Sequence, residues 1–116
     1  AGLASKRSKH RAVKVIVAGQ RFDSKLEARC WQMLKLRQSA GEIRNLRRQV
    51  RFSLFAPWGE HLGIYTADFA WEDGPPIAPV RKVADAKSYH TRKLPGWNRT
   101  KTLMRACHGI AVIELP

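Results

Sequence analysis

Apolar and polar residues alternate along the chain in a pattern that predicts two helices and several strands. β-Branched residues fill positions 12–18 and predict a strand, followed by a hairpin turn at Gly19-Gln20. Residues 23–40 predict a helix that ends before Gly41, because apolar side chains recur there every three or four positions. The apolar positions of this helix are Leu26, Cys30, Met33 and Leu34.

The second half of the chain predicts a β-meander, a second helix and a last strand. The strands are predicted over 48–55, 62–71, 78–87 and 110–115. The helix is predicted over 97–108 with a stop at Gly109, and the polar residues 88–96 before it predict a flexible loop. The whole pattern predicts one α+β domain over 12–116, in which a central mixed sheet is flanked by two helices.

The charge balance points to a class of partner. The chain of 116 residues has 22 Lys plus Arg against 9 Asp plus Glu, a net charge of +13. A small domain this basic is typical of proteins that bind nucleic acid. Residues 1–11 hold basic residues and no acid, which predicts either a solubilising tail or a flexible arm that tracks phosphates.

A second basic stretch, residues 44–51, holds arginines and no lysine. Guanidinium groups bind phosphate through two parallel hydrogen bonds, so this composition favours phosphate contacts over a merely solvated basic face. The predicted nucleic-acid contacts are Lys6, Arg7, Lys9, Arg11, Arg44, Arg47, Arg48, Gln49, Arg51, His90, Arg92, Lys93 and Lys101.

The apolar runs and the cysteines bear on the compartment. No run approaches the roughly 20 apolar residues of a membrane span, so no membrane partner is expected. Cys30 and Cys107 are far apart and belong to no Cys-x-x-Cys pair, so we expect two reduced, buried thiols in a cytosolic protein. The histidines show no zinc-ligand spacing with these cysteines, which disfavours a zinc site.

The stretch Val83-Ala84-Asp85-Ala86-Lys87 places an acid and a lysine in an otherwise small, apolar run. Side chains alternate between the two faces of a strand, so Asp85 and Lys87 are expected to project from the same side. There the carboxylate could hold a divalent metal, and the lysine could orient water or offset charge on a phosphate. The simpler alternative is an ion pair on a surface strand.

Two further acids come from other segments. Asp68 lies among apolar residues of the predicted strand 62–71, and a buried carboxylate needs either a metal or a partner such as an arginine. If the register allows, the antiparallel return of the chain places Asp68 near Asp85. Ser24-x-x-Glu27 has the form of a capping box, so Glu27 either caps the helix, faces a metal, or does both.

This order of elements and acids resembles the PD-(D/E)XK nuclease superfamily, which has a restriction-endonuclease-like α+β core. Five segments resemble, more narrowly, a small family of phage and prophage proteins of unknown function. That family is placed in the superfamily near the phage endonuclease I type of Holliday junction resolvase. The segments are Phe22-Asp23-Ser24-Lys25-Leu26-Glu27, Gly41-Glu42-Ile43, Gln49-Val50-Arg51-Phe52, Tyr65-Thr66-Ala67-Asp68-Phe69 and Asp85-Ala86-Lys87.

The resemblance implies roles for four side chains and one carbonyl. Asp68 and Asp85 would be ligands of Mg²⁺ or Mn²⁺, joined by the carbonyl of Ala86. Glu27 would ligate or orient a second metal or its water, and Lys87 would position the attacking water and stabilise the pentavalent phosphate. Glu27, Asp68, Asp85 and Lys87 are therefore expected to be catalytic.

Two positions depart from the superfamily pattern: Ala67 stands where a proline is common, and Asp85 stands where glutamate is commoner. The implied function is a metal-dependent endonuclease for branched or otherwise structured DNA. It would act as a homodimer in the cytoplasm of a bacterial host, from a phage or prophage gene. The alternative is a non-catalytic DNA-binding or packaging module with the same fold, and a weaker one is an RNA-binding protein.

Overall fold

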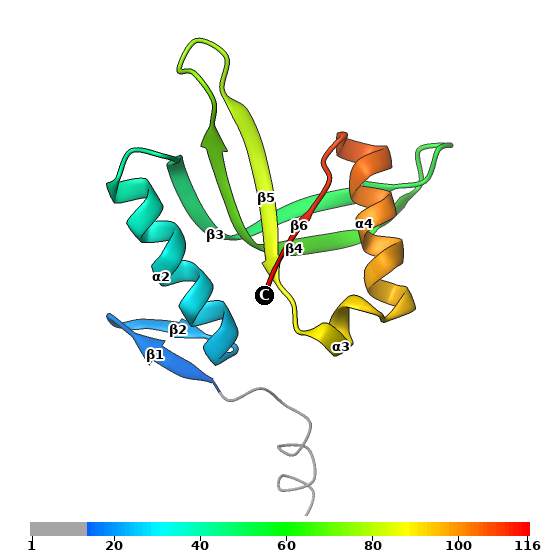
Figure 1. Ribbon diagram of the computed structural model, residues 1–116. Coiled ribbons are helices and arrows are strands. Elements are labelled where there is room, and N and C mark those ends of the chain that lie inside the picture. The colour runs from blue at the N-terminus through cyan, green and yellow to red at the C-terminus, as the bar shows by residue number, and fades with distance from the viewer. Residues whose placement is uncertain (1–13) are drawn as a thin grey trace, which may run out of the picture.

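Two β-sheets and two long helices make up the α+β fold of this chain, whose computed structural model describes residues 14–116 (Figure 1). The elements are β1 (Val15–Val17), β2 (Gln20–Phe22), α2 (Lys25–Ser39), β3 (Arg44–Phe55), β4 (His61–Asp73), β5 (Val80–Ala86), α3 (Tyr89–Arg92), α4 (Pro95–His108) and β6 (Ile113–Leu115). The predicted basic arm, residues 1–11, and the first two residues of the first predicted strand lie outside the described residues.

The main sheet has the strand order β3-β4-β5-β6 and is mixed, as predicted. β3, β4 and β5 pair antiparallel, whereas β6 returns after α4 and pairs parallel with β5. β1 and β2 form a separate hairpin whose turn residues, Ala18 and Gly19, both have positive φ, at 51° and 78°. Such backbone angles suit a two-residue hairpin turn, so Gln20 belongs to β2, one position earlier than predicted.

The two long helices cover different parts of the sheet, and a separate core cluster lies under each. Trp97 and Met104 of α4 pack with Phe52, Tyr65 and neighbouring residues. The cluster under α2 contains Cys30 and Leu34 of the helix with Ile43, Phe69, Trp71 and Ala84. Met33, predicted to lie on the same buried face, is instead 43% exposed, because the buried face of α2 is narrower than the apolar pattern suggests.

The strands β3 and β4 bend sharply between the two helices (Figure 1). Gln49 has a φ of 53°, which is uncommon for a residue with a side chain and marks a local break in the strand geometry. Arg48 pairs with Phe69 and Val50 with Ala67, so Gln49 lies opposite Asp68 at this bend. Ala67 belongs to the cluster under α4 and Phe69 to the cluster under α2, so Asp68 lies between the two clusters along β4.

Two segments differ from their sequence-based predictions. Residues 88–96 were expected to form a flexible loop, but they form the short helix α3 and the first turn of α4. Ser88 caps α3 by accepting a hydrogen bond from the Thr91 backbone N–H, and Pro95 begins α4, where its missing N–H costs nothing. β3 also begins at Arg44 rather than at residue 48, because the arginine-rich segment pairs with β4.

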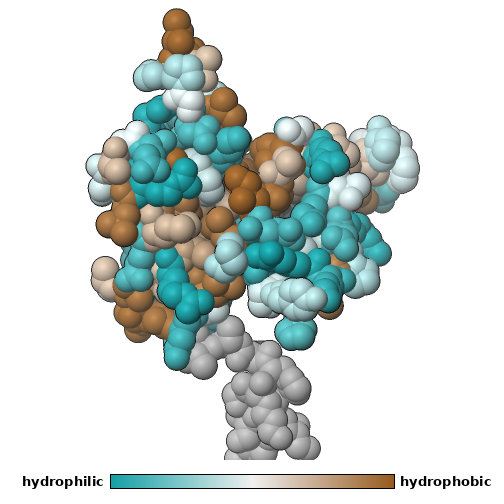
Figure 2. Space-filling model, in the orientation of Figure 1, coloured by the Kyte–Doolittle hydropathy of each residue, from teal (hydrophilic) through white to brown (hydrophobic). Residues whose placement is uncertain are grey.

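The β4–β5 hairpin projects beyond the rest of the sheet, and Figure 2 shows hydrophobic residues at its tip. The most exposed of them is Ile77, at 94%. None of the helices in the described part of the chain is both long and apolar enough to cross a membrane.

Candidate active site

Asp68 and Asp85 face each other where the pairing of β4 and β5 ends. The last paired residues are Phe69 and Ala84, so Asp68 and Asp85 occupy the next opposed position. There the carboxylates replace the ladder of backbone bonds: the Asp68 N–H donates to Asp85 Oδ1 at 2.6 Å, and the Ala86 N–H donates to Asp68 Oδ2 at 3.0 Å. The predicted proximity of the two acids is confirmed.

Lys87 lies on the same side as Asp85, as the strand alternation predicted, with its Nζ 3.4 Å from Asp85 Oδ2. The backbone of Lys87 is fixed on both sides, because its N–H donates to the Leu115 carbonyl of β6 and its carbonyl accepts from Arg92 Nε. The Asp85 side chain is 3% exposed and that of Lys87 is 23% exposed. The ion pair of the simpler alternative is thus present, but its acid is buried rather than on a solvated surface.

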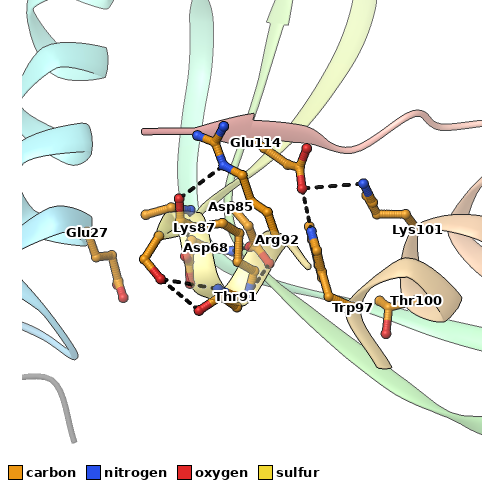
Figure 3. Close-up of polar contacts among 12 residues, drawn as sticks. Glu27, Asp68, Asp85, Lys87, Thr91, Arg92, Trp97, Thr100, Lys101 and Glu114 are labelled. Carbon is orange, nitrogen blue, oxygen red and sulfur yellow. Dashed lines mark hydrogen bonds and ion pairs between the residues drawn. The ribbon is translucent and has the colours of Figure 1, made fainter. Parts of the chain in front are cut away.

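Glu27 approaches from the first turn of α2 and is 4% exposed (Figure 3). Its backbone N–H donates to Ser24 Oγ, which is half of the predicted capping box. The Glu27 carboxylate takes no part in the cap: it accepts from Arg48 Nη2 at 2.9 Å and from Gln49 Nε2 at 3.3 Å. An arginine partner was the alternative to a metal for Asp68, but in the structure it is Glu27 that has one. The carboxylate of Asp68 accepts instead from the Ala86 N–H, its polar partner in the described residues.

Burial and two neighbouring acids raise the pKa of Asp68 to about 7. Loss of solvation is the largest cause, the charge of Asp85 the second and that of Glu27 the third, while the Ala86 N–H and Lys87 oppose them. The position of Asp68 thus lacks enough positive charge for a fully ionised carboxylate. A divalent cation would supply that missing charge.

A pocket of about 410 Å³ opens onto these groups between α2, the end of β5 and α3. Its polar lining residues are Asp23, Ser24, Glu27, Asp68, Lys87, Ser88 and Thr91, and Asp85 is buried next to them. A larger apolar pocket between the β1–β2 hairpin and α2 has no acid in its lining. Glu27 and Asp68 thus line the smaller pocket rather than the larger, apolar one.

The donor set suits a magnesium or manganese ion with an incomplete protein shell. Within residues 14–116, no three His, Cys, Asp or Glu groups converge in a way that could hold a metal. Mg²⁺ nevertheless commonly binds through one or two carboxylates and completes its shell with waters and substrate phosphate oxygens. Asp68 and Asp85 could supply such a pair of carboxylates.

The predicted nucleic-acid contacts divide into engaged and exposed groups. Lys6, Arg7, Lys9 and Arg11 lie outside the described residues. Several others make contacts within the chain: Arg44 with the carbonyls of Asp73 and Gly74, Arg48 with Glu27, Gln49 with Glu27, Arg92 with the Lys87 carbonyl, Lys93 with Tyr89, and Lys101 with Glu114. Arg47, Arg51 and His90 are exposed, so they are the positions best placed to reach a phosphate.

Four residues near the site were absent from the predicted set. Ser88 and Thr91 line the pocket, and their Ser-x-x-Thr spacing was the available signal for a capped turn. Trp97 lies against Lys87, with the ammonium 4.4 Å from the ring centroid, and Glu114 accepts a hydrogen bond from the indole. No sequence signal marks the last two, because only the packing of α4 and the pairing of β6 with β5 bring them to Lys87.

The comparisons with known proteins add a family but no activity. One family model matches residues 7–97, and its description is "Protein of unknown function (DUF1064)". The match includes Glu27, Asp68, Asp85 and Lys87, whereas Glu114 lies beyond it. No curated protein and no solved structure matches the chain significantly.

Proposed function

The chain belongs to the DUF1064 family, and we propose that it is a metal-dependent endonuclease that hydrolyses phosphodiester bonds in DNA. The observation that carries the proposal is the opposed pair Asp68 and Asp85 at the end of the β4–β5 ladder, with the Lys87 ammonium 3.4 Å from Asp85. Asp68 and Lys87 line one pocket and Asp85 is buried beside them, and in a chain with net charge +13 this arrangement suits a cation and a polyanionic substrate.

The residues of the site divide the chemistry among them. Asp68 and Asp85 would hold Mg²⁺ or Mn²⁺, which when bound supplies positive charge at the phosphate and activates water for attack. The Lys87 ammonium would donate to phosphate oxygens as their negative charge grows. Glu27, fixed by Arg48 and Gln49, lines the pocket and would orient the attacking water.

The basic surface suits a substrate that is recognised through its phosphates. Exposed arginines contact the backbone of a duplex without reading bases, and this favours a substrate recognised by shape, such as branched DNA. A junction offers two equivalent scissile strands, so we expect the active form to be a homodimer with one site per protomer.

Cleavage of labelled DNA tests the proposal directly. Four-way junctions, forks, nicked duplexes and plain duplexes are incubated with Mg²⁺, with Mn²⁺ or with a chelator. Wild type is expected to cut at least one of them only when a metal is present. Asp68→Asn and Asp85→Asn should each lower the rate by at least about 100-fold and leave DNA binding intact, because both acids hold the ion rather than the DNA.

Asp73→Asn is the matched control, since Asp73 is an acid of the same hairpin that does not line the pocket. It should cut like wild type. If wild type cuts none of the DNAs with either metal, or if both aspartate variants cut as fast as wild type, the proposed activity is wrong.

One observation favours a second function, a DNA-binding module without catalysis. The Glu27 carboxylate is occupied by Arg48, and no third acid joins Asp68 and Asp85 at ligating distance in the described residues. Under this alternative Asp68→Asn binds DNA as wild type does, and Mg²⁺ changes neither the stability of the protein nor the DNA.

A further inference from the structure

The Lys87 ammonium contacts the ring of Trp97 as well as the carboxylate of Asp85. Its ammonium lies over the face of Trp97, with Nζ 4.4 Å from the ring centroid, while Nζ is 3.4 Å from Asp85 Oδ2 (Figure 3). An ammonium group this close to an indole face is attracted by the negative charge of the π system, and the attraction grows as water is excluded. The lysine thus has two independent partners on two elements, β5 and α4.

The indole is itself fixed in place. Trp97 is 7% exposed and its Nε1–H donates to Glu114 Oε2 at 2.6 Å, while the Tyr65 ring packs against it at a centroid distance of 6.1 Å. Glu114 belongs to β6, which pairs with β5 in the register that sets Glu114 beside Asp85. The ring therefore cannot turn its face away from Lys87 without breaking a short, charge-assisted hydrogen bond.

Glu114 remains charged at neutral pH. The hydrogen bond from Trp97 holds the pKa of Glu114 below its usual range, and Lys101, whose Nζ lies 3.3 Å from the same oxygen, acts in the same direction. A carboxylate that accepts from the indole N–H adds electron density to the ring and so favours a cation on its face. The positive end of this network is Lys87, at the edge of the pocket.

We propose that Trp97 is a positioning residue that keeps the Lys87 ammonium at the catalytic pocket, and that Glu114 orients the indole for this purpose. The role rests on the proposed nuclease function. A cation held by Asp85 competes with the Asp85–Lys87 ion pair, so the lysine then needs another contact to stay in place. The Trp97 face supplies that contact without neutralising the charge that a phosphate requires.

Nuclear magnetic resonance of ¹³C-lysine-labelled protein tests the placement without relying on activity. Protons over an indole face are shifted upfield, so the Lys87 ε-methylene signal, assigned with Lys87→Met, should lie upfield of the position of a solvated lysine. In Trp97→Leu this signal should move to the position of a solvated lysine. In Trp97→Phe, which keeps an aromatic face but loses the N–H, the shift should be partly retained.

Kinetics then test the role. Trp97→Leu should lower kcat by about tenfold with little change in KM, and Trp97→Phe should recover part of the loss. Glu114→Gln leaves the ring in place and removes its charged acceptor, so its kcat should fall between those of wild type and Trp97→Leu. Thermal unfolding identifies any variant that fails to fold. If Trp97→Leu fails to fold, Trp97→Phe and Glu114→Gln still test the role.

Trp58→Leu is the matched control, because the Trp58 Nε1–H also donates to a glutamate, Glu60, in the turn between β3 and β4. It should leave the Lys87 signal and kcat unchanged. An unshifted Lys87 signal in wild type overturns the proposal, and so does a Trp97→Leu variant that cuts as wild type does. If the signal responds to Trp97 but wild type cuts no DNA, the nuclease function fails and the catalytic role of Trp97 with it, while the lysine–indole contact stands.

Discussion

At the scale of single residues, Asp68 is a carboxyl group whose surroundings disfavour its ionised form. Its backbone N–H and its carboxylate both take part in the crossed hydrogen bonds with β5, so it cannot move out to solvent without opening the strand pair. Burial and the charge of Asp85 raise its pKa to about 7. For stability alone, an uncharged amide at position 68 would be more favourable than this carboxyl group.

The first prediction concerns pH and stability in metal-free buffer. The pKa of Asp68 is raised on folding from its ordinary value of 3.8 to about 7, so its contribution to stability is full below pH 3.8 and is lost as pH rises through 7. Asp68→Asn does not ionise and lacks this loss. The Tm of the variant relative to that of wild type should therefore increase from pH 4.5 to pH 8. A Tm difference that does not change with pH would contradict the raised pKa.

The second prediction concerns metal binding at the same acids. A cation that binds the folded state alone raises the free energy of unfolding by mass action, about 2.7 kcal/mol at 100 times its Kd. Mg²⁺ or Mn²⁺ should therefore raise the Tm of wild type at pH 8, with no such rise in Asp68→Asn. Asp73→Asn serves as the control and should respond as wild type does. If neither ion changes the Tm of wild type, the proposed metal site at Asp68 and Asp85 is wrong.

At the scale of elements, Arg48 connects three of them. From β3 its guanidinium reaches Glu27 of α2 at 2.9 Å, donates to the Arg21 carbonyl of β2 and lies 3.9 Å from the Phe22 ring centroid. The side chains of Arg48 and Glu27 are only 18% and 5% exposed. This joint holds the β1–β2 hairpin and the first turn of α2 against the main sheet.

The third prediction follows from that joint. Arg48→Met leaves the Glu27 carboxylate buried without its ion-pair partner, which should lower the free energy of unfolding by about 3 kcal/mol. Adding Glu27→Gln removes the stranded charge and should restore much of the loss. Denaturant unfolding of the two single variants and the double variant gives the coupling energy. Arg47→Met, at the exposed neighbouring position, should cost little; additive losses at Arg48 and Glu27 would contradict the joint.

The elements also show what the sequence could and could not predict. The β-meander and the meeting of Asp68 with Asp85 followed from strand alternation and a short antiparallel connection, both of which are local signals. The prediction of a loop over 88–96 was wrong because it followed the polar composition of the segment. The capping serine and the proline at the start of α4 are the signals that indicate helices there. The partners of Glu27 and Lys87 were beyond prediction, since Arg48 and Trp97 reach them through tertiary packing.

At the scale of the whole molecule, positive charge surrounds a small group of acids. The chain carries +13 net charges, yet several arginines and lysines are engaged with carbonyls or acids of the fold. Figure 2 shows hydrophilic side chains gathered over α3 and α4, beside the pocket. The exposed arginines Arg47 and Arg51 are the β3 positions left to contact a backbone of phosphates.

The last prediction concerns the salt dependence of DNA binding. Each phosphate contact releases counterions, so the logarithm of the binding constant falls with the logarithm of salt concentration by about 0.9 per contact. Replacing both Arg47 and Arg51 with Gln should make that slope shallower by about 2, measured by fluorescence anisotropy without added metal. Arg37→Gln is the control, since Arg37 is paired with Glu42 at 3.2 Å and should leave the slope unchanged. If the double variant keeps the wild-type slope, DNA is bound by another surface, and the pocket must be reached from there.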